Sequence, residues 1–136
     1  MLLFHGCGGM RPHLPRYAQA AAERGWTAVT VDSYAARGWS RVYALATVCT
    51  GAQLWGRTRA GDVLAALWGV TEEGWADPGR LVLAGWSHGA WSVMDLMCMP
   101  LERAGEAGVA DPRAALLDGV RGTFLMYPYG GVGALS

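Results

Sequence analysis

The chain has 136 residues, of which 52% are hydrophobic and 16% are charged, and its net charge at neutral pH is zero. A single domain of this length can bury a core without disulfides or metals. The charged share lies below the roughly 25% of an ordinary soluble domain. The chain therefore buries a large fraction of its residues, or it leaves an apolar face that another segment or molecule covers. The zero net charge gives no basic surface for nucleic acid and no cationic face for a membrane, and we expect neither partner.

The cysteines Cys7, Cys49 and Cys98 are too few and too scattered for a disulfide framework or a zinc site. We expect three buried thiols, with one bridge and one free thiol as the alternative. The first residues lack the basic region and the cleavage site of a signal peptide, and no apolar stretch approaches the roughly 18–20 residues that span a bilayer. We expect a soluble protein without cofactor or metal, and we favour the cytoplasm, although the sequence leaves the compartment open.

Strand-type runs alternate with helical ones along the chain. Apolar runs favour strands over four ranges: 1–4, 26–31, 80–84 and 120–127. Apolar residues spaced three and four apart predict helices over three ranges, 14–22, 60–68 and 90–98, and an irregular stretch is expected from 33 to about 57. The order β-α-β-α-β-α-β predicts an α/β fold with a parallel sheet between two helical layers. Ligands of such sheets bind at the carboxyl ends of the strands, where three glycine loops of this sequence lie.

A G-x-S-x-G motif, Gly85-Trp86-Ser87-His88-Gly89, stands between the third apolar run and the helix after it. In a serine hydrolase the nucleophile occupies a strained strand-to-helix turn, and small residues two positions away on either side let the chain fold back. The following helix directs its N-terminal dipole at the place where negative charge develops. Out of context, the motif favours a glycine-rich turn whose serine caps the helix.

A second loop, His5-Gly6-Cys7-Gly8-Gly9, reverses that preference. Acyl transfer to a serine needs two backbone N–H donors for the tetrahedral oxyanion. One comes from the residue after the nucleophile, here His88, and the other from an H-G-x-G-type loop after a neighbouring strand, where Cys7 holds the donor position. A phosphate-binding turn is the alternative for this loop, but the loop lacks the G-x-G-x-x-G spacing and a G-K-[ST] sequence.

Further segments extend the pattern over nearly the whole chain. Val31-Asp32-Ser33-Tyr34-Ala35-Ala36-Arg37-Gly38 contains D-S-[FY]-x-x-R-G, Arg59-x-x-Asp62 precedes Ala65-Ala66-Leu67, and Tyr127-Pro128-Tyr129 stands at the end of the last apolar run. Together with the two glycine loops, these segments resemble the dienelactone-hydrolase-like family of α/β-hydrolases. The founding members use a cysteine nucleophile, whereas this chain has Ser87, as in many relatives. Activity on dienelactone itself is therefore not implied.

The resemblance implies an α/β-hydrolase-type three-layer sandwich and the hydrolysis of a small ester or lactone. Ser87 would be the nucleophile, and the amides of Cys7 and His88 would bind the oxyanion. Trp86 in the elbow, His13 near the mouth and Tyr129 after the last strand are the expected substrate contacts.

In that family the acid and then the histidine base follow the nucleophile, on loops after the seventh and eighth strands. Residues 1–136 match only the third to sixth strands, so we expect a single partial domain whose acid and base lie outside the chain. The histidines present do not fit the role of base: His88 should point away from the serine hydroxyl, and His5 should support its loop. Asp32 is expected to anchor the loop over 33–41, with Arg37 as a partner.

Two functions from different classes remain open. The first is a serine hydrolase of ester- or lactone-type substrates, which would work through a Ser87 acyl-enzyme. The second is a non-catalytic, truncated or degenerate α/β module with a binding or assembly role. Because a partial sheet leaves its edges unpaired, we also expect self-association through those edges and little activity from residues 1–136 alone.

Overall fold

Four parallel strands form the central sheet of the computed structural model, which describes residues 1–112 and 114–130. The strands are β1 (Leu2–Phe4), β2 (Val29–Val31), β3 (Leu81–Trp86) and β4 (Val120–Met126). Their spatial order is β2-β1-β3-β4, and every pairing is parallel. The expected parallel α/β sheet is therefore confirmed.

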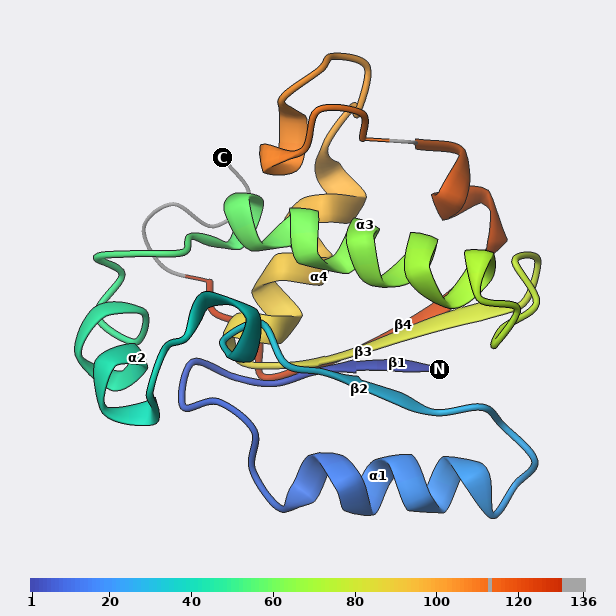
Figure 1. The fold of residues 1–136 in the computed structure, drawn as a ribbon, viewed down its shortest axis with the longest axis horizontal. Coiled ribbons are helices and arrows are strands. Elements are labelled where there is room, and N and C mark those ends of the chain that lie inside the picture. The colour runs from blue at the N-terminus through green and yellow to red at the C-terminus, as the bar shows by residue number, and fades with distance from the viewer. Residues whose placement is uncertain (113, 131–136) are drawn as a thin grey trace.

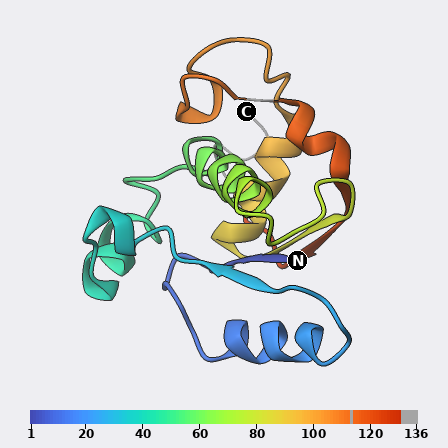
Figure 2. The same ribbon diagram turned by 45° about the vertical axis from the view of Figure 1, so that its right-hand side comes forward.

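Helices cover both faces of this sheet. Helix α1 (His13–Ala22) lies on one face, and α3 (Gly56–Glu72) and α4 (His88–Cys98) lie on the other (Figure 1). The same three layers are visible after a turn of the molecule, with α2 (Arg41–Thr47) beyond the carboxyl ends of the strands (Figure 2). Short 3-10 helices occupy three further segments: η1 (Ala35–Arg37), η2 (Glu106–Gly108) and η3 (Ala114–Gly119).

The two faces of the sheet build two apolar cores, because successive residues of a strand point to opposite sides. Leu2, Phe4 and Leu83 pack with the predicted apolar stripe of α3 and with α4. Leu3 and Trp86 pack on the other face, against α1. In the described residues, no helix combines the length and hydropathy that a bilayer crossing requires.

Two expectations about the elements are wrong in part. The stretch from 33 to 57 is not irregular throughout, because it contains η1 and α2; the Ser40 hydroxyl accepts a hydrogen bond from the Tyr43 amide and caps α2. The run 26–31 forms a strand only over Val29–Val31, and Trp26 before it is 44% exposed. Both errors arise in short elements, in which a few residues carry the periodic pattern.

The sheet register positions the two glycine loops. Phe4, the last residue of β1, is the partner of Gly85 in β3. The loop that starts at His5 and the turn that contains Ser87 therefore leave neighbouring strands at the same edge of the sheet.

Candidate active site

Ser87 occupies a strained turn between β3 and α4. Its backbone angles are φ 51° and ψ −113°, in a region that residues with a side chain rarely adopt. The flanking glycines are sterically required. A Cβ on Gly85 would lie 2.6 Å from the Ala90 nitrogen, and one on Gly89 would lie 2.3 Å from the Phe4 carbonyl oxygen of β1. The expected reason for small residues on both sides of Ser87 therefore holds in the structure.

The Ser87 hydroxyl does not act as a helix cap. Its side chain makes no capping hydrogen bond at the start of α4, and its amide donates to the Met126 carbonyl at 2.9 Å. The hydroxyl instead belongs to a half-buried residue that lines a cleft of about 300 Å³. The helix-capping alternative is therefore wrong for this turn.

The loop after β1 closes against this turn. A Cβ on Gly6 would lie 3.4 Å from the Ser87 Cβ and 3.3 Å from the Trp86 carbonyl oxygen, so the backbone approaches closely. The Gly9 amide donates to the Gly6 carbonyl at 3.1 Å and tightens the loop. Cys7 and His88 line the same cleft as Ser87. Their roles as oxyanion donors stay a prediction.

A buried arginine, Arg59 of α3, ties these parts together. It is completely inaccessible to solvent. Its guanidinium donates to the His5 carbonyl at 2.8 Å, to the Ser33 hydroxyl at 2.9 Å and to Nδ1 of His88 at 2.8 Å. Burial lowers the pKa of Arg59 to about 10, so the side chain is a cation at neutral pH. One cation therefore fixes the start of the β1 loop and the first residue of α4.

The two histidines beside Arg59 are uncharged. An arginine can only donate, so His88 accepts at Nδ1 and its Nε2 carries the proton, which it donates to the Leu54 carbonyl at 2.6 Å. His5 accepts the Ser33 amide at Nε2 and donates from Nδ1 to the Gly6 carbonyl at 2.7 Å. Burial, and next the charge of Arg59, lowers the pKa of His5 to about 4 and of His88 to about 3. The exposed Asp32 carboxylate, 3.7 Å from His5, does not offset this.

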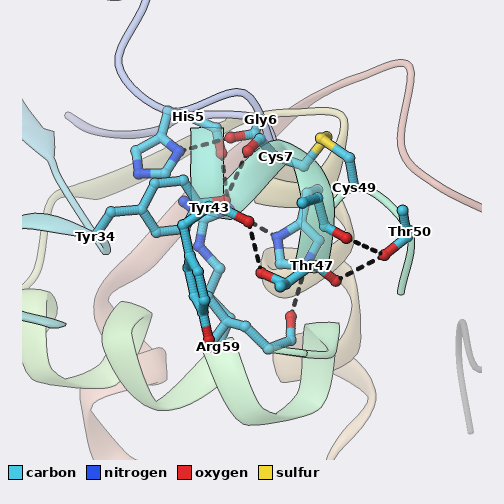
Figure 3. The surroundings of a disulfide bond; sticks show 12 residues. His5, Gly6, Cys7, Tyr34, Tyr43, Thr47, Cys49, Thr50 and Arg59 are labelled. Carbon is cyan, nitrogen blue, oxygen red and sulfur yellow. Dashed lines mark hydrogen bonds between the residues drawn. A yellow bond between two sulfur atoms is a disulfide. The ribbon is translucent and has the colours of Figure 1, made fainter. Parts of the chain in front are cut away.

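Two restraints hold Cys7 in place. Its sulfur is bonded to Cys49, which follows α2, and the Tyr34 hydroxyl donates to its carbonyl at 2.9 Å (Figure 3). The expectation of three buried thiols is wrong, because Cys7 and Cys49 form a disulfide and Cys98 is exposed. The chain folds back through η1 and α2, so that Cys49 lies at the same cleft as Cys7. The spacing of the cysteines along the sequence does not predict this contact.

The expected substrate contacts separate into two groups. Tyr129 lines the cleft with Ser87. Trp86 and His13 are not among the described residues that line it. Trp86 is 4% exposed and packs against His13 and Tyr17 of α1, on the opposite face of the sheet. Strand alternation explains this: Trp86 directly precedes Ser87 and points to the other side. Of the three expected contacts, the described structure therefore brings Tyr129 to the Ser87 cleft and places Trp86 and His13 elsewhere.

Other cleft residues were not singled out from the sequence. Trp55 and Trp91 line the cleft, and the Cys7–Cys49 bridge forms part of its wall. Trp55 immediately precedes α3, and Trp91 lies one turn after Ser87 on α4. The position of Trp91, four residues after Ser87 and so one helical turn away, is the signal that could have identified it.

Arg37 also has a different partner from the expected one. It forms a two-pronged ion pair with Asp62, both distances being 2.9 Å. Asp32 anchors its loop as expected, but by accepting the backbone amides of Tyr34 and Ala35.

Comparisons with known proteins give no relative for this site. The chain matches no protein-family model, no curated protein and no solved structure. The described residues also contain no group of three or more His, Cys, Asp or Glu side chains arranged to hold a metal ion.

Proposed function

We propose that this chain carries the nucleophile and oxyanion site of a serine hydrolase that acts on an ester- or lactone-type carbonyl. The observation that carries the proposal is the backbone of Ser87, which is strained at positive φ on a strand-to-helix turn and leaves its hydroxyl uncapped in a cleft. Strain of this kind costs about 1–3 kcal/mol and is concentrated at functional sites.

In the proposed reaction, Ser87 Oγ attacks the carbonyl carbon and its proton passes to a base. The carbonyl oxygen becomes an oxyanion, which the amides of Cys7 and His88 and the N-terminus of α4 stabilise. Collapse expels the alcohol, or opens the lactone ring, and leaves an acyl-enzyme at Ser87. Water then attacks the acyl carbon and releases the acid.

The base is the part of this mechanism that the described cleft does not supply. Among the described lining residues, His88 is the only histidine, and both of its ring nitrogens are already hydrogen-bonded. We therefore propose that the base, and the acid that orients it, lie outside this chain. The same observation favours the second candidate, a non-catalytic module that keeps the hydrolase turn for a binding or assembly role.

Labelling with a fluorophosphonate probe distinguishes the two functions. Imidazole added to purified residues 1–136 supplies a base in solution. If the proposal is right, imidazole accelerates labelling, and mass spectrometry places the label on Ser87. Ser87→Ala should abolish the label, whereas the exposed-serine control Ser40→Ala should retain it.

Three kinds of result would each contradict one part of this proposal. Labelling that persists in Ser87→Ala, or a label found on another residue, would remove Ser87 as the nucleophile. The absence of labelling at any imidazole concentration would favour the non-catalytic module. Robust aryl-ester turnover without imidazole that disappears in Ser87→Ala would show that a base is already present in the chain.

A further inference from the structure

The cleft beside Ser87 contains no ionised side chain among its described lining residues. None of them is Asp, Glu or Arg, and the chain has no Lys. Its cysteines are joined in the disulfide and do not ionise. Its histidine, His88, is neutral, because burial and Arg59 lower the pKa to about 3. A substrate group that enters this cleft therefore meets no charged side chain among these described residues.

The nearby cation does not change this. Arg59 lies behind His88, is completely buried and is not one of the described residues that line the cleft. Its hydrogen bonds go to the His5 carbonyl, the Ser33 hydroxyl and His88. A carboxylate on the part of a substrate that lies against the cleft walls, away from the proposed oxyanion donors, would lose hydration without gaining an ion pair, which is strongly unfavourable.

The walls of the cleft are aromatic. Trp91 is 4% exposed, and its ring centroid lies 4.9 Å from that of Tyr129 and 5.3 Å from that of His88. Trp55 is 43% exposed, and its indole nitrogen donates to the Gly51 carbonyl at 2.8 Å. That hydrogen bond satisfies the polar atom of Trp55 and holds the ring. The apolar surface of the indole is then available to a flat ligand.

The size of the cleft limits the group that it can hold. Its volume of about 300 Å³ is at the lower end of the range for small-molecule sites. Such a volume suits one ring and the ester that links it to the reacting carbonyl.

We propose that this cleft binds a neutral, single-ring aromatic portion of the ester substrate and discriminates against substrates that carry a carboxylate. The inference rests on the proposed function, because it names the substrate class of the Ser87 site. Trp55, Trp91 and Tyr129 contact the ring, and the absence of a cation gives the discrimination.

The test uses two ligands that share one side chain and residues 1–136 as they are. The ligand 4-phenylbutan-2-one (the ketone) is a neutral, unreactive isostere of benzyl acetate, and 4-(3-oxobutyl)benzoate (the carboxylate) carries the same side chain with a carboxylate on the ring, away from the proposed oxyanion donors. Calorimetric titration should show the ketone binding at least about 10-fold more tightly than the carboxylate. Trp55→Ala should weaken ketone binding by about 2- to 12-fold, the range of an aromatic pair. Trp75→Ala, an exposed tryptophan away from this cleft, should leave it unchanged.

A gain-of-function variant makes the test independent of losses caused by misfolding. Thr50 lines the cleft and is exposed, so Thr50→Arg introduces a cation there and should increase carboxylate affinity by about 10-fold or more. Val42→Arg, on an exposed site of α2 outside the cleft, should not. Equal or tighter binding of the carboxylate by the original chain, or no binding of either ligand, would overturn the inference.

The outcome can be separated from that of the proposed function because no bond is made in these titrations. Ketone selectivity without fluorophosphonate labelling would retain the aromatic cleft and reject the hydrolase. Labelling of Ser87 without ketone selectivity would retain the hydrolase and reject the aromatic cleft.

Discussion

Acid should destabilise this fold through two histidines that are buried uncharged. The pKa is lowered to about 4 for His5 and to about 3 for His88, whereas an unfolded histidine has a pKa of about 6.5. Between these values the unfolded chain binds more protons than the folded chain, so the free energy of unfolding falls as the pH falls. The histidine contribution is fully present above about pH 6.5 and is lost progressively below it.

The expected magnitude follows from the same pKa difference. Between pH 7 and pH 5, each histidine should lower the free energy of unfolding by about 2 kcal/mol, or about 4 kcal/mol for both. A domain of this kind has about 5–15 kcal/mol in total, so the effect is large. Carboxylates act mainly at lower pH, because their unfolded pKa values lie near 4.

Urea unfolding at pH 7, 6 and 5 measures this contribution. His88→Asn retains an acceptor near Nδ1 but cannot take up a proton, so the loss between pH 7 and pH 5 should shrink by about half. His13→Gln is the matched control, because the partly buried His13 lies outside the Arg59 network, and most of the loss should remain. A change below about 1 kcal/mol in the original chain over this pH range would refute the neutral-histidine assignment.

Two further predictions concern the elements that hold the cleft. Gly89→Ala should lower the free energy of unfolding by about 1–3 kcal/mol, because the new Cβ meets the carbonyl oxygens of Phe4 and His5. A Cβ at Gly69 of α3 would meet open space, so Gly69→Ala should raise the free energy of unfolding by about 0.5–1 kcal/mol. Equal effects of Gly89→Ala and Gly69→Ala would contradict the packing argument. Cys7→Ser removes a disulfide that joins residues 42 positions apart and should lower the free energy of unfolding by about 4 kcal/mol. The control Cys98→Ser, at an exposed free thiol, should change the free energy of unfolding little. An unchanged melting temperature in Cys7→Ser would contradict the disulfide.

The elements around the candidate nucleophile could be predicted from local sequence. An apolar run that ends in glycines, followed by a helical stripe, specifies both the strand and the turn, so β1, β3 and the start of α4 were predicted nearly as observed. The steric need for Gly85 and Gly89 follows from the same motif. These features depend on residues that are neighbours in the chain.

The features that could not be predicted depend on long-range contacts. Arg59 is separated by 54 residues from the His5 carbonyl that it contacts, and Cys7 by 42 residues from Cys49. An arginine on a helix ordinarily faces solvent, so its type and position do not indicate burial. Trp86 lies away from the Ser87 cleft for a different reason: it neighbours Ser87 in sequence, but successive residues of a strand point to opposite faces of the sheet.

The strain at Ser87 offers a last test of why this serine is present. Glycine adopts a φ of 51° at no steric cost, so replacing Ser87 with glycine should relieve strain worth about 1–3 kcal/mol. This gain exceeds the backbone entropy that glycine loses on folding, which costs about 0.5–1 kcal/mol. Ser87→Gly should therefore raise the free energy of unfolding by about 1 kcal/mol, while Ser87→Ala, which keeps the strain, should stay within about 0.5 kcal/mol of the original chain. Urea unfolding of the two variants measures the difference. A stabilised glycine variant that can no longer be labelled would mean that the hydroxyl is kept at the expense of stability, as a nucleophile requires. A destabilised glycine variant would mean that the serine side chain supports the fold, and the main argument for the hydrolase would fail.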